Sequence, residues 1–296
     1  MRKALITGLG GFTGRYLAEQ LQSRGYEIAG LEAFAQPAGA YEMHVCNLND
    51  RKGLADVVAR VQPDVVAHLA AISFVAHGDA DEIYRTNVAG TRNLLEALAG
   101  APRKPGSVLL ASSANIYGNA LVDPITEDTP ASPANDYAVS KLAMEYMARL
   151  WAGQLPITIV RPFNYTGVGQ SPNFLIPKIV DHFRSGAAGI ELGNIEVARD
   201  FSDVRTVAAI YARLLELAPA GQVFNVCSGR AITLQQVLDM MQALTGRSME
   251  VAINPAFVRA NEVKTLRGSQ DKLAAVVGEL ERPAFEQTLQ WMLEAP

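Results

Sequence analysis

The stretch Arg2-Lys-Ala-Leu-Ile-Thr7-Gly8-Leu-Gly-Gly11-Phe-Thr-Gly14 decides the fold. A short apolar run ends in three glycines with the spacing G-x-x-G-x-x-G, and an amphipathic segment follows over residues 15–24. A strand, a glycine turn and a helix in this order can hold a phosphate, because the helix N-terminus offers N–H groups and the positive end of its dipole. The stretch therefore predicts a dinucleotide site at the first βα turn.

Each glycine of this turn has an expected role. Gly8 permits the tight turn, Gly11 lets the backbone approach a pyrophosphate, and Gly14 lets the helix pack closely on the strand. The second strand, 27–32, ends in Glu32, where a carboxylate can bond the ribose hydroxyls and repel a 2′-phosphate. We therefore expect NAD(H) in preference to NADP(H), although a surface glutamate at a strand end is the other interpretation of Glu32.

Further strands are expected at 41–46, 64–68, 107–110 and 157–160, alternating with helical patterns. This alternation predicts an α/β fold with a Rossmann-type doubly wound parallel sheet. Ligands bind at the carboxyl ends of such strands. Ala70, Ser113 and Asn164 follow three of these ends, so we expect them to line the same site as Gly8 and Glu32.

After Asn164, glycines and prolines break the alternation of strands and helices. We expect a nucleotide-binding domain at 1–165, to which residues 203–227 return. Residues 166–296 are expected to form a smaller C-terminal α/β substrate-binding lobe.

Composition excludes several classes of protein. The 296 residues carry a net charge of −4, with a pI of about 5.7, which argues against a general nucleic-acid or anionic-membrane surface. The two cysteines lack Cys-x-x-Cys spacing, and the four histidines lack metal-ligand spacing. The sequence shows neither a signal peptide nor a membrane-length apolar run. We expect a cytoplasmic protein without a metal ion.

Tyr137 and Lys141 lie four residues apart, on one face of an expected helix that the chain enters through Ser132-Pro133. Apolar residues recur with helical spacing at Leu142, Tyr146, Met147 and Leu150. A lysine ammonium one turn away favours the tyrosine phenolate, so the phenol can exchange a proton nearer pH 7. A tyrosine and a lysine at this spacing also occur by chance in many helices.

Six motifs together resemble the extended short-chain dehydrogenase/reductase family, in order and over essentially the whole chain. They are residues 8–14, His68-Leu-Ala-Ala71, Asn87-Val-Ala-Gly-Thr91, Ser112-Ser-Ala-Asn-Ile-Tyr-Gly118, Tyr137-x-x-x-Lys141 and Arg161-Pro-Phe-Asn164. The resemblance implies a Rossmann domain that holds NAD(P) and a C-terminal lobe that holds a nucleotide sugar. It implies that Ser113 and Tyr137 bond the reacting oxygen, with Tyr137 as the general acid. Lys141 would bind the nicotinamide ribose and tune Tyr137, and Asn87 would orient the site.

The resemblance also implies the cofactor contacts. They are Gly8, Gly11, Phe12, Thr13, Gly14, Glu32, Asn47, Leu48, Leu69, Ala70, Ala71, Asn87, Tyr137, Lys141 and Arg161.

The residues after Ser113 narrow the chemistry. Nucleotide-sugar 4,6-dehydratases, which resemble this chain, carry a glutamate just after the catalytic hydroxyl, often with an aspartate before it. Ala114 and Asn115 stand here instead and cannot do acid–base work, so we expect no dehydration. The segments 161–170, 198–204, 225–229 and 259–269 are similar to those of GDP-4-keto-6-deoxy-D-mannose reductases. That similarity implies substrate contacts at Ser113, Asn164, Asn173, Lys178, Arg199, Arg259 and Glu262.

The sequence thus predicts an NAD(P)H-dependent reductase acting on the C4 keto group of a GDP-4-keto-6-deoxy-hexose. The product is GDP-rhamnose or GDP-6-deoxytalose, and both remain open. The alternatives are an NAD-dependent nucleotide-sugar 4-epimerase and a non-catalytic dinucleotide-binding scaffold. That reductase group often uses NADPH, whereas Glu32 favours NADH. The family resemblance implies a homodimer through a four-helix bundle, formed by the helices at 81–98 and 133–150.

Overall fold

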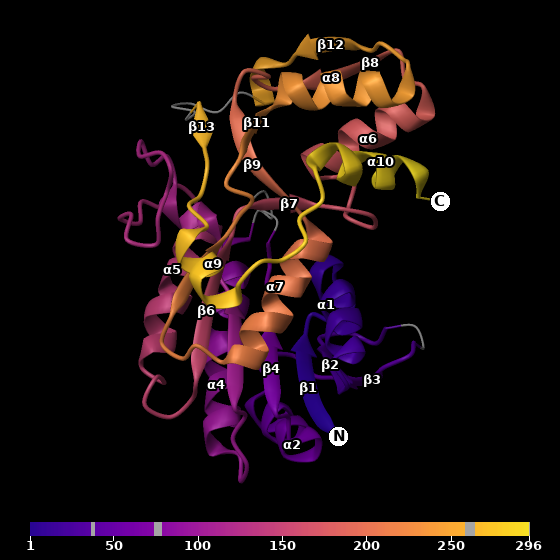
Figure 1. Cartoon of the computed structure of the whole chain (residues 1–296). Helices are drawn as coiled ribbons and strands as arrows, with labels where there is room; N and C mark the ends of the chain where they lie inside the picture. Colours follow the sequence, from indigo (N-terminus) through magenta and orange to yellow (C-terminus); the bar gives the residue numbers. More distant parts are fainter. Residues whose placement is uncertain (37–38, 74–78, 258–263, 296) are drawn as a thin grey trace. The chain divides into compact units, whose positions relative to one another are not determined.

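Figure 1 shows the computed structural model of the chain, which describes residues 1–36, 39–73, 79–257 and 264–295. The chain divides into two compact units. The first unit comprises Met1–Gly118, Pro130–Pro162 and Ala208–Phe224. The second unit comprises Asn119–Thr129, Phe163–Val207 and Asn225–Pro296.

The first unit is built on a seven-stranded sheet with the strand order β10-β6-β5-β4-β1-β2-β3. All the pairings among β1 to β6 are parallel. The order reverses between β1 and β4, and in doubly wound sheets ligands bind at this switch point. The predicted Rossmann-type fold is therefore confirmed. The strands are β1 (Arg2–Thr7), β2 (Tyr26–Glu32), β3 (Glu42–Val45), β4 (Val65–His68), β5 (Ser107–Ala111), β6 (Ile157–Pro162) and β10 (Val223–Val226).

Helices lie on both faces of this sheet. The buried faces of α2, α4 and α5 share one apolar core with strand residues such as Leu5, Val66 and Leu110. Figure 1 shows α1 and α7 in front of the strands, and Arg24 and Glu216 join their ends at 3.7 Å. The helical segments are α1 (Phe12–Ser23), α2 (Arg51–Val61), α3 (Ala80–Tyr84), a π-helical turn η1 (Arg85–Gly90), α4 (Thr91–Gly100), a 3-10 turn η2 (Ala114–Tyr117), α5 (Asp136–Arg149) and α7 (Val204–Leu217).

Helix α5 begins later than the sequence suggested. Its N-cap is Asn135, whose side chain accepts a hydrogen bond from Ala138 N at 2.9 Å, so the expected start at Ser132-Pro133 is wrong. The helical spacing is confirmed, but Tyr146 and Leu150 are 59% and 79% exposed. Helix α5 therefore presents apolar side chains on its outer surface.

The second unit contains two small sheets. One has the order β11-β9-β13, with β7 also paired to β9, and the other pairs β12 with β8. Its core forms where α6, α8 and α10 pack on these strands, and Phe201 stacks on Phe285 with ring centroids 5.4 Å apart. The strands are β7 (Asn164–Thr166), β8 (Gly189–Leu192), β9 (Ala198–Asp203), β11 (Ala231–Thr233), β12 (Glu250–Ile253) and β13 (Thr265–Leu266). The helical segments are α6 (Leu175–Ser185), α8 (Leu234–Thr245), η3 (Pro255–Phe257), α9 (Asp271–Val277) and α10 (Phe285–Glu294).

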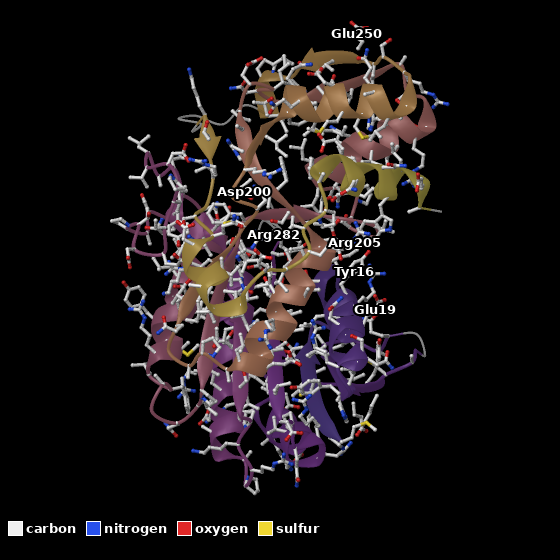
Figure 2. All side chains as sticks on the ribbon, viewed as in Figure 1. Tyr16, Glu19, Asp200, Arg205, Glu250 and Arg282 are labelled. Atoms are coloured by element: carbon white, nitrogen blue, oxygen red, sulfur yellow. The ribbon has the colours of Figure 1, made fainter. Side chains whose placement is uncertain are left out.

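Figure 2 labels Asp200, whose carboxylate is buried in the second unit. It accepts hydrogen bonds from Ser228 N and Oγ at 2.7 Å, from Gly229 N at 3.0 Å and from Gly268 N at 3.3 Å. These bonds hold β9 to the turn after β10 and to the chain after β13. Residues 119–129 belong to this unit rather than to the predicted first domain, because Ile125 forms a bridge with Gly268.

Candidate active site

The glycine turn after β1 fits a bound pyrophosphate. Gly8 has a φ of +75°, and a Cβ there would lie 2.9 Å from Ala70 N. A Cβ on Gly14 would lie 2.2 Å from the Gly8 carbonyl oxygen, so close helix packing excludes a side chain. Helix α1 starts after Gly11 without a side-chain cap, and its first turn, with Phe12 and Thr13, contains no acidic residue. An anion is favoured at such a helix N-terminus.

Glu32 lies against this turn. Its Oε1 accepts a hydrogen bond from Gly10 N at 2.6 Å, and burial raises the pKa of the carboxyl while the bond from Gly10 lowers it. The side chain is therefore held at the end of β2, beside the backbone that would approach the dinucleotide. This placement is the one that the sequence predicted for a ribose-binding carboxylate, and the contact itself stays a prediction.

The chain after β4 returns to the end of β1. Leu69 N donates to the Thr7 carbonyl at 3.1 Å, and Ala70 N donates to Thr7 Oγ1 at 3.2 Å. Leu69, Ala70 and Ala71 therefore lie next to the glycine turn, as expected of a wall of the cofactor site. The two cofactor contacts predicted after β3 differ in burial. Asn47 is exposed, whereas Leu48 is buried beside Gly90.

Ser113 follows the end of β5, and Lys141 of the Tyr137–Lys141 pair reaches that strand end from α5. Ser113 Oγ accepts a hydrogen bond from Asn115 N at 3.1 Å, which leaves its hydroxyl hydrogen available to a substrate oxygen. Lys141 Nζ donates to the carbonyl of Ala111, the last residue of β5, at 2.7 Å. The same ammonium lies 5.9 Å from the centroid of the Tyr137 ring. The structure thus brings Lys141 to a strand end that lies 30 residues earlier in the sequence.

Burial sets the charge of Lys141. The side chain is 5% exposed, and this loss of hydration lowers the pKa of Lys141 to about 8, while the carboxylate of Glu145 opposes the shift. Near pH 7 the ammonium form still predominates. A buried positive charge near the Tyr137 ring favours the phenolate form of that side chain.

Arg161 has a different setting from the one predicted. Its guanidinium binds Glu145 through two bonds, Nε to Oε1 at 2.9 Å and Nη2 to Oε2 at 2.6 Å, and donates to Tyr117 Oη at 2.8 Å. Both charged side chains are buried. This arrangement favours an internal role for Arg161, and its predicted contact with the cofactor remains a prediction.

Sequence reasoning missed Glu145 and Tyr117 as members of this cluster. The signal for Glu145 was present, because it lies four residues after Lys141 on the same helix. Tyr117 carried no such signal, since 44 residues separate it from Arg161.

Apart from Ser113, the predicted substrate residues that the structure describes lie in the second unit. Asn164 is exposed, and Arg199 donates from Nη1 to the carbonyls of Ala198 and Lys264. Lys178 Nζ donates to the Glu191 carbonyl at 2.9 Å, and Asn173 is exposed before α6. Arg259 and Glu262 fall outside the described residues.

None of the helices in the described ranges combines the length and the apolar composition that a membrane crossing requires. No group of three or more His, Cys, Asp or Glu side chains within those ranges could hold a metal ion.

The chain is similar to known proteins over most of its length. The model of the NAD dependent epimerase/dehydratase family matches residues 4–227. GDP-6-deoxy-D-talose 4-dehydrogenase of Aggregatibacter actinomycetemcomitans is 32% identical over 277 residues, which cover 93% of this chain and 91% of that protein. GDP-6-deoxy-D-mannose reductase of Pseudomonas aeruginosa is 32% identical over 303 residues, which cover 99% and 96%.

Two solved structures are also similar over the full chain. A crystal structure from Burkholderia cenocepacia J2315 is 51% identical with a TM-score of 0.95, covering 99% of this chain and 97% of its own. The structure of RMD from Pseudomonas aeruginosa complexed with NADPH is 30% identical with a TM-score of 0.87, covering 99% and 98%. The resemblance seen in the motifs is therefore confirmed, and the chain belongs to the NAD dependent epimerase/dehydratase family of extended short-chain dehydrogenases/reductases.

Proposed function

We propose that the protein reduces the C4 keto group of a GDP-4-keto-6-deoxy-D-mannose-type nucleotide sugar to a GDP-6-deoxyhexose. The observation that carries the proposal is that Lys141, 5.9 Å from the Tyr137 ring, binds the end of β5 two residues before Ser113. Ala114 and Asn115 follow Ser113. The site has a proton donor for a carbonyl oxygen and lacks carboxylates after Ser113 for an elimination. The names of the two curated relatives support GDP-6-deoxy sugars as the substrate class.

The chain's own residues would perform the proton transfer. Ser113 donates a hydrogen bond to the C4 oxygen, and Tyr137 transfers its phenolic proton to that oxygen as the carbonyl becomes an alcohol. Lys141 then favours the phenolate through its positive charge until solvent returns the proton. The nicotinamide, when bound, supplies the hydride that reaches C4.

We propose NADH as the preferred reductant. Glu32 is the residue that supports this choice, because its carboxylate lies beside Gly10 at the end of β2. A 2′-phosphate near that carboxylate would bring two like charges together. A related structure binds NADPH, so both reduced cofactors belong in the assay.

We propose that the GDP-sugar is held by polar side chains of the second unit. Arg199 and Lys178 offer positive charge for a diphosphate, and Asn164 and Asn173 offer amides for the sugar or base. We propose in addition that the Glu262 carboxylate accepts hydrogen bonds from guanine and that Arg259 binds the diphosphate.

We propose that two copies of the chain pair through η1, α4 and α5. Val139 and Tyr146 on α5, and Leu150 directly after it, present apolar surface and are 38%, 59% and 79% exposed. Burying them against a second copy would complete a four-helix bundle. Sedimentation should give a dimer that Leu150→Glu weakens, while the exposed Leu121→Glu elsewhere in the chain leaves it intact.

We also expect the protein to act in the cytoplasm. Cys46 and Cys227 are both buried free thiols, and burial raises the pKa of each. Thiols of this kind suit a reducing compartment.

The deciding experiment is incubation of the protein with GDP-4-keto-6-deoxy-D-mannose and either NADH or NADPH. Loss of the reduced cofactor with formation of a C4 alcohol supports the proposal. Proton NMR of the product then distinguishes GDP-rhamnose from GDP-6-deoxytalose. Interconversion of two hydroxyl sugars without net cofactor change would instead establish a 4-epimerase. Cofactor binding without turnover of any keto or hydroxyl nucleotide sugar would leave the scaffold alternative.

A further inference from the structure

A chain of buried polar side chains runs from the end of β1 to helix α5. Its members are Thr7, His68, Thr91, Asn87 and Ser140, each at most 4% exposed. None of these side chains has a part in the proton transfer described above. Burying so many polar groups is costly unless every one is hydrogen-bonded, so their partners define what the chain does.

The hydrogen bonds fix one direction for the first part of this chain. The Thr91 hydroxyl donates to the Asn87 carbonyl at 2.7 Å, so its oxygen faces His68 Nε2, 2.8 Å away, as an acceptor. His68 Nε2 must therefore carry the hydrogen, and Nδ1 accepts from the Thr7 hydroxyl at 2.7 Å. Thr7 Oγ1 in turn accepts from Ala70 N. Each hydroxyl donates once and accepts once.

Asn87 continues the connection to the catalytic helix. Its Oδ1 accepts from Ile72 N at 2.9 Å, and its Nδ2 donates to the Ile72 carbonyl at 3.1 Å and to Ser140 Oγ at 3.0 Å. Ser140 then donates to the carbonyl of Tyr137 at 2.8 Å. Asn87 lies in the π-helical turn η1, a wide turn of the kind that is frequent at functional sites.

We propose that His68, as the neutral Nε2–H tautomer, is a positioning residue that ties the glycine turn after β1 to the backbone of Tyr137. His68 acts through Thr7 on one side and through Thr91, Asn87 and Ser140 on the other. The turn that would hold the dinucleotide and the phenol that would protonate the substrate are thereby held by one connected set of bonds. Only the expected effect of this role on turnover rests on the proposed function.

The environment keeps His68 in the form that the chain requires. Burial, together with the positive charge of Lys141, lowers the pKa of His68 to about 3. A protonated ring would present donors at both nitrogens, and Nδ1 could no longer accept from Thr7. The neutral ring therefore persists across the pH range in which the enzyme would work.

The test compares two threonine-to-valine changes of the same kind. Thr91 and Thr158 are each 1% exposed, lie in the first unit, and donate to one backbone carbonyl. Only Thr91 belongs to the chain, because Thr158, which lies on β6, donates from Oγ1 to the carbonyl of Pro219. Both variants lose one buried hydroxyl, and Thr91→Val also leaves His68 Nε2–H without its acceptor. A purely structural role therefore predicts losses of stability, with the larger loss in Thr91→Val, and no difference in catalysis.

With NADH and GDP-4-keto-6-deoxy-D-mannose, we expect Thr91→Val to lower kcat about 10–100-fold with little change in the KM for NADH. Thr158→Val should keep the wild-type kcat, and Thr91→Ser, which retains the hydroxyl, should recover most of it. Amide hydrogen exchange of residues 136–141 should rise in Thr91→Val alone. Equal kcat and equal exchange in the two valine variants would overturn the proposal.

A second readout needs no turnover. Nitrogen-15 shifts of the four histidines, with His68 assigned from His68→Asn, report which ring nitrogen is protonated. We expect a hydrogen on Nε2 and none on Nδ1 at pH 7, and the reverse tautomer would contradict the directed chain. If the wild type fails to reduce the keto sugar, the proposed function fails, while exchange and tautomer still decide the role of His68.

Discussion

Lys141 donates from Nζ to the carbonyl of Ala111 at 2.7 Å and so joins the first half of α5 to the end of β5. Ala111 lies two positions before Ser113 on the chain. A single bond thus fixes the catalytic helix against the strand end that carries the second candidate catalytic residue. The bond also explains how a lysine can be almost fully buried, because its ammonium keeps an acceptor while it loses water.

Lys141→Met should stabilise the protein at neutral pH while it abolishes efficient turnover. The pKa of Lys141 is lowered from 10.5 to about 8, so the buried charge costs about 3 kcal/mol near pH 7 at about 1.4 kcal/mol per pKa unit. Methionine removes that cost but leaves the Ala111 carbonyl without this donor, which costs about 1 kcal/mol. We expect a net gain of about 1–2 kcal/mol in the free energy of unfolding by urea.

The sign of the pH effect provides a control for this variant. Between about pH 8 and 10.5 the unfolded lysine holds a proton that the folded one has released, so wild-type stability rises with pH in this window. The advantage of Lys141→Met should therefore shrink by about 1.4 kcal/mol per pH unit there. If the stability difference between Lys141→Met and wild type stays constant up to pH 10.5, the cost assigned to the buried charge of Lys141 is wrong.

Tyr137→Phe should lower kcat by about 10²–10⁴-fold, because it removes the general acid and leaves the ring in place. The dissociation constant for NADH should stay close to that of the wild type, because the phenolic hydrogen is transferred to the substrate oxygen. Single-turnover kinetics and cofactor titration measure the two quantities separately. A variant that turns over the keto sugar at the wild-type rate would remove Tyr137 from the mechanism.

Glu145→Gln should destabilise the protein by about 3–5 kcal/mol, because it leaves the buried Arg161 guanidinium without its counter-charge. The double variant Glu145→Met, Arg161→Met should recover most of this loss. Since the Glu145 carboxylate raises the pKa of Lys141, its removal should move the alkaline limb of kcat/KM to lower pH in both variants. Urea unfolding measures the loss of stability, and the pH profile of kcat/KM measures the position of the alkaline limb. A limb that stays at the wild-type pH would show that Glu145 does not influence the pKa of Lys141.

The parts of this site that could be predicted are those that depend on residues close together in the sequence. The turn from Gly8 to Gly14 needs only neighbouring residues, and Tyr137 and Lys141 are matched by helical spacing alone. The strand-end rule correctly brought Ala70 to the glycine turn, because parallel strands bring their carboxyl ends together. The start of α5 was misplaced because Ser132 and Asn135 are both acceptable caps, and the structure selects Asn135.

The connections between these local parts could not be predicted. His68 lies 61 residues from Thr7 and 23 from Thr91, so no short pattern marks their hydrogen bonds. In the sequence, His68 is a polar residue at the end of an apolar strand. Its partners, and hence its tautomer, are decided by the pairing of β1 with β4 and by the position of α4.

His68→Asn should make the free energy of unfolding depend less on pH below 6.5. The pKa of His68 is lowered from 6.5 to about 3, so between these values the unfolded state binds a proton that the folded state excludes. Wild-type stability should therefore fall by about 1.4 kcal/mol per pH unit from this group as pH drops below 6.5. At pH 7.5 the variant should be less stable than the wild type, because it has lost contacts of the ring. This difference in the free energy of unfolding should narrow steadily as the pH falls to 4.5.

Glu32→Gln should shift the enzyme toward NADPH. Glutamine keeps an oxygen that can accept from Gly10 N, so the glycine turn is retained while the negative charge is removed. The ratio of kcat/KM for NADPH to that for NADH should rise about tenfold or more, which corresponds to about 1.4 kcal/mol of relieved repulsion. Glu27→Gln removes the same charge from the exposed part of β2, where it faces Lys3 at 3.9 Å, and should leave the ratio unchanged. Equal ratios in the two variants would show that the carboxylate of Glu32 does not meet the adenosine ribose.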